Sequence, residues 1–134
     1  MDITLDHLLI PAADRVAAAR RVGELFGVEW AEQGPIGPFS PVYVSPSLTL
    51  LFCQWPGPVP QQHYAFRVDD ERFDSILARL VAAGIAYRSH PLGEDDGQIN
   101  TAFGGRLVYW REPDGHAWEM LTVSYERPGA LPPG

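Results

Sequence analysis

The chain restarts halfway along, and this internal repeat restricts its fold more than any other feature. An apolar strand-like run, LDHLLIPAAD at residues 5–14, opens the first half, and a second strand, HYAFRV at 63–68, opens the second half. The histidines of these two strands, His7 and His63, stand 56 residues apart. Such positional agreement between two halves indicates one supersecondary unit used twice.

The segments after each opening strand also match. Each half continues with an amphipathic helix that follows a capping aspartate, Asp14 in the first half and the pair Asp69 and Asp70 in the second. Each helix is predicted to stop at a glycine, Gly27 or Gly84. Period-two alternation then predicts three strands in each half: 28–31, 41–45 and 48–54, then 85–90, 105–112 and 116–123.

These elements predict an α+β fold of two tandem β-α-β-β-β modules that form a curved mixed sheet around a ligand cleft. The helices would cover the outer face of the strands. A length of 134 residues suits a single domain. We expect module one at about 1–55, a Pro/Gly linker at 56–61, module two at about 62–125 and a loose tail at 126–134.

Composition and charge exclude several classes of partner. The net charge of −7 and the absence of any Lys/Arg cluster argue against nucleic-acid binding. No apolar stretch reaches the roughly 20 residues that span a bilayer. Asp2 and Asp6 stand where a signal peptide would be positive, and the single cysteine, Cys53, excludes an internal disulfide. We therefore expect a cytoplasmic protein that acts on a small molecule.

Three side chains form a candidate metal site. His7 and His63 occupy equivalent positions in an apparent two-fold repeat, so their opening strands should lie close together. Glu119 lies inside the apolar segment AWEMLTV, where a carboxylate is unfavourable unless it is paired or bound to a metal. Two imidazoles and one carboxylate hold a divalent metal and leave positions open for substrate. A histidine that merely packs in the core is the alternative for either imidazole taken alone.

The chain resembles the vicinal oxygen chelate superfamily, which includes glyoxalase I, extradiol dioxygenases, fosfomycin-resistance enzymes and bleomycin-resistance proteins. LDHLLIPAAD, HYAFRVDD and GRLVYWREPDGHAWEMLT carry the resemblance, which covers residues 3–125. It implies paired β-α-β-β-β modules, often in a homodimer that completes each site. By position, it also implies metal ligands at His7, His63 and Glu119, with Fe, Mn, Zn or Ni as the ion.

Departures from the family pattern narrow the expected activity. Glyoxalase I uses a fourth ligand, a carboxylate, whose counterpart here falls close to Leu50 in a stretch with no acid or histidine. Fosfomycin-resistance enzymes carry a hydroxyl residue where this chain has Leu9, and they bind a phosphonate with several cations, whereas this chain has no lysine. Two histidines and a glutamate match the ligand set of the extradiol dioxygenases, which use Fe(II) or Mn(II).

Two function hypotheses therefore stand. The first is a divalent-metal-dependent enzyme, a lyase, isomerase or extradiol-type dioxygenase, whose small substrate chelates the ion through vicinal oxygens. The second is a metal-free binding protein that sequesters a small molecule, as bleomycin-resistance proteins do. Arg67, Arg106 and Tyr109 are candidate substrate-binding residues. His116, in the turn PDGH, is interpreted as structural.

Overall fold

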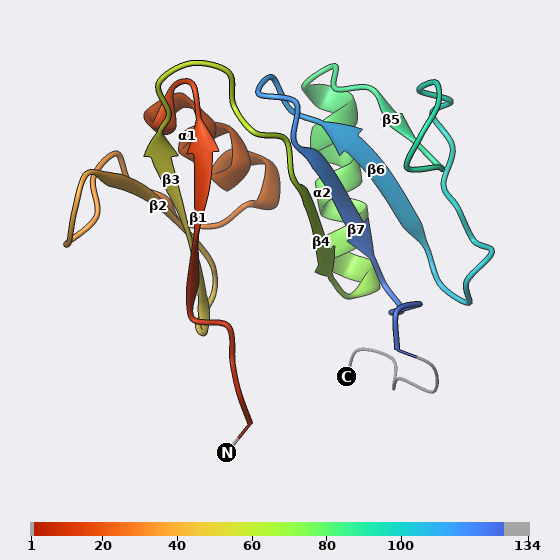
Figure 1. Ribbon diagram of the computed structural model, residues 1–134. Helices are drawn as coiled ribbons and strands as arrows, with labels where there is room; N and C mark the ends of the chain where they lie inside the picture. Colours follow the sequence, from red (N-terminus) through yellow and green to blue (C-terminus); the bar gives the residue numbers. More distant parts are fainter. Residues whose placement is uncertain (1, 128–134) are drawn as a thin grey trace. The chain divides into compact units, whose positions relative to one another are not determined.

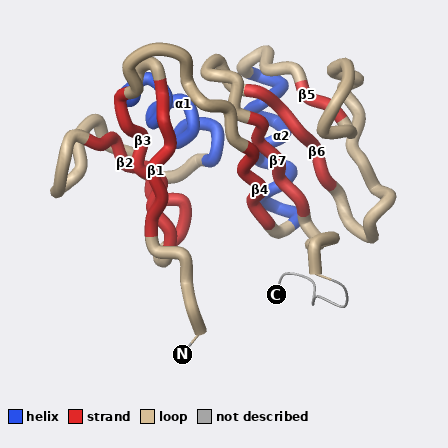
Figure 2. The backbone as a smooth tube through the Cα atoms, viewed as in Figure 1, coloured by secondary structure: helices blue, strands red, loops and turns tan. Residues whose placement is uncertain are grey.

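The computed structural model describes residues 2–127, which divide into two compact units, 2–60 and 61–127. Most of the expected tail, 126–134, lies outside the described residues. Each unit combines a mixed sheet with a helix, so the predicted α+β class is confirmed (Figures 1 and 2). No helix within residues 2–127 has the length and apolar character needed to cross a membrane.

In the first unit, three strands pair in the order β1-β3-β2 within the described residues. The strands are β1 His7–Ala12, β2 Phe39–Ser45 and β3 Leu48–Gln54, and the helix is α1 Arg15–Phe26. β3 runs parallel to β1 and antiparallel to β2. The Asp14 side chain caps α1 by accepting from the Ala17 N–H at 3.1 Å, and Gly27 ends the helix at φ 68°, both as predicted.

The sheet of the first unit has a buried face and an exposed face. Strand alternation sends five apolar side chains to the buried face, toward α1: Ile10, Ala12, Val42, Leu50 and Phe52. The opposite face carries His7, Leu9 and Tyr43, which are exposed. This unit therefore buries one face of its sheet and presents His7 on the other.

In the second unit, four strands pair in the order β4-β7-β6-β5 within residues 61–127. They are β4 His63–Arg67, β5 Tyr87–Arg88, β6 Leu107–Arg111 and β7 Ala117–Leu121, and the helix is α2 Asp70–Ala82. α2 lies across one face of this sheet (Figure 1). On that face the rings of Phe66 and Trp118 stack with centroids 5.7 Å apart, and Met120 and Val108 are fully buried.

Two strands differ from the sequence prediction, and of the predicted capping pair Asp69 and Asp70 the structure uses the first. Residues 28–31 form no strand; Trp30 alone bridges Val42, because the Gly/Pro-rich stretch that follows turns the chain away from the sheet. The strand expected at 85–90 is shorter and covers only Tyr87–Arg88, because the Ser89 N–H donates to the Asp96 carboxylate and not to a neighbouring strand. The second helix is capped by Asp69, whose carboxylate accepts from the Arg72 N–H at 2.7 Å.

Candidate metal centre and its surroundings

The strand register of the second unit brings His63 and Glu119 together. β4 and β7 run parallel, with His63 opposite Ala117 and Ala65 opposite Glu119, so all four side chains project from one face. His63 Nε2 lies 3.0 Å from Glu119 Oε1. This juxtaposition of two predicted ligands depends on pairing between strands that are far apart in the sequence.

Glu119 is buried among partners that compensate its charge. Its side chain is 0% exposed, while that of His63 is 49% exposed. The Tyr125 hydroxyl contacts both carboxylate oxygens, at 3.0 Å to Oε1 and 2.9 Å to Oε2. A buried carboxylate is strongly unfavourable without such donors. The pair thus consists of a carboxylate sealed into the protein and an imidazole that remains open to solvent.

Two tyrosines extend this cluster. Tyr109 of β6 stands directly opposite Glu119 of β7, and its ring centroid is 6.2 Å from that of His63. The Tyr109 and Tyr125 hydroxyls are hydrogen-bonded to each other. Burial raises the pKa of Tyr109 above its ordinary value. Burial, together with the hydrogen bonds to Tyr109 and Glu119, also raises the pKa of Tyr125.

Tyr125 was not predicted from the sequence. It lies beyond the last strand, in a segment where neither alternation nor helical spacing indicates which way a side chain points. The chain turns back after Leu121, and the Tyr125 ring packs against Leu107, Tyr109 and Leu121. Only this turn places its hydroxyl on Glu119, so no pattern local to the sequence could have identified it.

His7 belongs to the first unit, on the exposed face of β1. Its side chain is 59% exposed, and its Nδ1 lies 2.7 Å from the Asp6 carboxylate. A carboxylate on Nδ1 fixes the imidazole tautomer and directs Nε2 outward, which is the arrangement typical of a metal-binding histidine. Among residues 2–127, no group of three or more His, Cys, Asp or Glu side chains forms a cluster suited to a metal.

The register corrects the predicted counterpart of Glu119 in the first unit. Ala65, two residues after His63, faces Glu119, and Leu9, two residues after His7, faces Leu51. The equivalent position is therefore Leu51 and not Leu50, whose side chain is 0% exposed on the opposite, helix-covered face. Since Leu51 is apolar too, the first unit provides no carboxylate ligand at this place.

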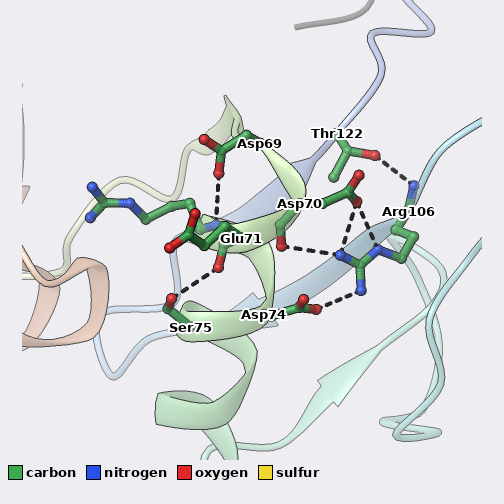
Figure 3. Close-up of polar contacts among 8 residues, drawn as sticks. Asp69, Asp70, Glu71, Asp74, Ser75, Arg106 and Thr122 are labelled. Atoms are coloured by element: carbon green, nitrogen blue, oxygen red, sulfur yellow. Dashed lines mark hydrogen bonds and ion pairs between the residues drawn. The ribbon is translucent and has the colours of Figure 1, made fainter. Parts of the chain in front are cut away.

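The two candidate arginines have different surroundings. Arg67 lies on the same face as His63 and Ala65, and it is exposed. Arg106 is held by α2: its guanidinium donates to Asp70 at 2.9 Å and Asp74 at 2.7 Å (Figure 3), and it lies 4.3 Å from the centre of the Phe73 ring. These contacts tie Arg106 to the helix and do not bring it to His63.

His116 has the structural role predicted for it. Its side chain is fully buried, and Nδ1 accepts from the backbone N–H of Gln62 at 3.1 Å. The turn before it depends on Gly115, which adopts a φ of 90° that other residues rarely adopt. His116 therefore links the start of β4 to the start of β7 through the residue that directly precedes His63 in the sequence.

The donor pair fits a divalent metal ion. Two neighbouring donors on one ion, with bonds of about 2.1 Å at right angles, lie about 3.0 Å apart. The Nε2–Oε1 separation of 3.0 Å has this value. A neutral imidazole nitrogen and a carboxylate oxygen also match the preferences of Zn, Fe, Mn and Ni. His63 and Glu119 are thus held in a relation that a metal could use without rearrangement of the backbone.

Known structures share this fold over nearly the whole chain, and the chain belongs to the vicinal oxygen chelate superfamily. It is 41% identical to a protein named oxidase ChaP-H1, with 94% of this chain and 100% of that chain covered and a TM-score of 0.84. Oxidase ChaP-H2 is 36% identical, with 96% and 100% covered and a TM-score of 0.86.

A more distant likeness shows the fold alone. TnmS3, an antibiotic binding protein from Streptomyces sp. CB03234, is 22% identical, with 92% of this chain and 99% of that chain covered and a TM-score of 0.65. No protein-family model matches the chain, and no curated protein sequence matches it significantly. The same fold thus occurs in proteins named as oxidases and in a protein named for binding an antibiotic.

Proposed function

We propose that the chain is a divalent-metal-dependent enzyme that oxidises a small substrate chelated through two vicinal oxygens. The observation that carries the proposal is the placement of His63 Nε2 3.0 Å from the buried carboxylate of Glu119. Sequence identities of 41% and 36% to two proteins named as oxidases support oxidation over the isomerase and lyase alternatives. His63 and Glu119 would hold the ion, with His7 as the third ligand.

Each group of the candidate site would have a different role in binding the ion or the substrate. A divalent ion held by these residues would supply Lewis-acid stabilisation of a deprotonated substrate oxygen. The exposed His63 imidazole lies where substrate can approach, and buried Glu119 contributes charge that solvent does not screen. Tyr109, directly opposite Glu119, places a phenol hydroxyl on the same face. Arg67 adds a cation about 7 Å along β4 from Ala65, suited to an anionic substituent.

Metal analysis and oxygen uptake test the proposal. Protein purified without chelator is expected to contain a stoichiometric divalent ion, and added Mn(II), Fe(II), Zn(II) or Ni(II) is expected to raise the melting temperature of apoprotein. His63→Ala and His7→Ala should each weaken this effect. Catechol-like diols are expected to cause oxygen uptake under air by metal-loaded protein.

The outcomes separate the proposal from its alternative. If no ion stabilises the apoprotein, and the protein still binds small molecules, the result would support the metal-free sequestering function instead. His7→Ala with an unchanged dissociation constant for Mn(II) would exclude His7 as the third ligand. Metal-dependent turnover of a diol without oxygen uptake, equal under air and nitrogen, would exclude the oxidase reaction and favour isomerisation or lyase chemistry.

A further inference from the structure

The segment after β7 returns to the face of the sheet that carries the candidate metal ligands. Tyr125, four residues beyond the end of β7, packs its ring on Leu107, Tyr109 and Leu121. The Phe103 ring also packs against it, with centroids 5.1 Å apart. Apolar contacts therefore hold the ring without involving its hydroxyl, and they fix the position of the hydroxyl oxygen.

The Tyr125 hydroxyl lies against the carboxylate of Glu119. The Tyr125 oxygen lies 3.0 Å from Oε1 and 2.9 Å from Oε2, and His63 approaches Oε1 alone. The terminal torsion of a glutamate is soft, so packing does not by itself fix which oxygen faces a neighbour. A hydroxyl has one proton to donate. When a cation or an imidazole N–H engages Oε1, that proton remains available to Oε2.

We propose that Tyr125 is the positioning residue of Glu119: its hydroxyl retains Oε2, presents Oε1 beside His63, and so keeps the carboxylate a one-oxygen ligand. This inference rests on the metal site of the proposed function. A carboxylate that used both oxygens would occupy an extra position on the ion, whereas a one-oxygen ligand leaves that position open for a substrate that binds through two oxygens. Tyr125 thereby contributes to metal affinity and to the number of open positions without touching the ion.

The variant Tyr125→Phe tests this, because it removes the hydroxyl and keeps the ring that packs on Leu107 and Leu121. Loss of an outer partner of a metal ligand typically weakens metal binding by about 10–100-fold. We expect that range for the dissociation constant of Mn(II), measured by titration calorimetry on the full chain. We also expect an altered visible absorption spectrum of the Co(II)-loaded variant, since the second carboxylate oxygen is free to bind.

Tyr87→Phe is the matched control. Tyr87 pairs with Trp110 on the other face of the same sheet, so its variant should bind Mn(II) as the wild type does and give an unchanged Co(II) spectrum. Tyr125→Phe with wild-type affinity and spectrum would overturn the inference. Loss of Mn(II) binding in His63→Ala, beside intact binding in Tyr125→Phe, would refute the role of Tyr125 while leaving the metal site standing. Unchanged binding in His63→Ala would refute the site itself.

A measurement on the unsubstituted protein covers the case in which Tyr125→Phe folds poorly. The chain has five tyrosines, so labelling their ring carbons that bear the hydroxyl gives five NMR signals. Tyr→Phe variants at positions 43, 64 and 87 assign three of them and leave the Tyr109 and Tyr125 pair. Adding Zn(II) is expected to shift both remaining signals. A Zn(II)-bound protein in which neither of these two signals shifts would overturn the inference.

Discussion

Replacing Glu119 by glutamine should separate metal binding from folding. The side chain is fully buried and contacts His63 Nε2 and the Tyr125 hydroxyl. Glutamine has almost the same shape, its carbonyl oxygen can accept from Tyr125, and its amide can donate to a neutral His63 imidazole. It also removes a charge whose burial is unfavourable. We therefore expect the free energy of unfolding of apoprotein to change by no more than about 1 kcal/mol.

The metal-dependent stabilisation of the wild type gives the expected size of the effect. With Mn(II) at 100 times its dissociation constant, binding to the native state alone contributes about 2.7 kcal/mol. For a chain of 134 residues, 1 kcal/mol shifts the melting temperature by about 4 °C, so the wild type should gain about 10 °C. If Glu119→Gln weakens binding about 100-fold, the same Mn(II) concentration contributes about 0.4 kcal/mol, or less than 2 °C.

Differential scanning calorimetry of apoprotein and Mn(II)-loaded protein measures both quantities. Glu94→Gln is the charge-matched control, because it makes the same change at an exposed position of the same unit and should keep the full shift. A Glu119→Gln variant that Mn(II) stabilises as strongly as the wild type would refute the assignment of Glu119 as a ligand. An apoprotein of this variant that melts far below the wild type would refute the argument that the carboxylate serves binding and not folding.

Two further predictions concern the second unit. The pKa of Asp96 is lowered from its ordinary 3.8, chiefly by the hydrogen bond from the Ser89 hydroxyl, so its stabilisation is present above the unfolded pKa and is lost as pH falls through the folded value. Asp96→Asn should therefore lower the urea midpoint at pH 7 but not at pH values below the folded pKa; an equal difference at every pH would contradict this. His116→Ala leaves a cavity and an unpaired Gln62 N–H, for which we expect a loss of about 2–4 kcal/mol in urea unfolding; a loss below about 1 kcal/mol would show that the turn does not need the imidazole.

The repeat allowed much of the fold to be predicted, because its signals are local. Alternation, capping aspartates and glycine stops depend only on residues a few positions apart, and α1, β3 and β4 lie where these signals place them. Predictions were wrong where tertiary hydrogen bonds compete with a local pattern. Ser89 has a strand-like sequence context, yet its N–H is bound by Asp96 from the following loop. Residues 28–31 pair with β2 through a single bridge.

The candidate site was less accessible because it depends on strand register. The distance between the two halves predicted a relation between His7 and His63, but a shift of one residue changes the face on which a side chain lies. The predicted counterpart of Glu119 was Leu50, whereas the parallel pairing of β1 and β3 gives Leu51. Arg106 illustrates the same limit: it directly precedes β6, and alternation directs it toward Asp70 and Asp74 on α2.

The two repeat units share an architecture but differ in what they bring to a metal. The second unit holds His63 beside a fully buried carboxylate, so these two donors are ordered by folding of that unit alone. The first unit presents one largely exposed imidazole, His7, with Asp6 on its inner nitrogen and the apolar Leu51 where a carboxylate would otherwise stand. Each unit therefore offers a different donor set: the first an exposed imidazole alone, the second an imidazole together with a buried carboxylate. The negative charge that a divalent ion requires comes from Glu119 of the second unit, because the first unit has the apolar Leu51 at the corresponding position.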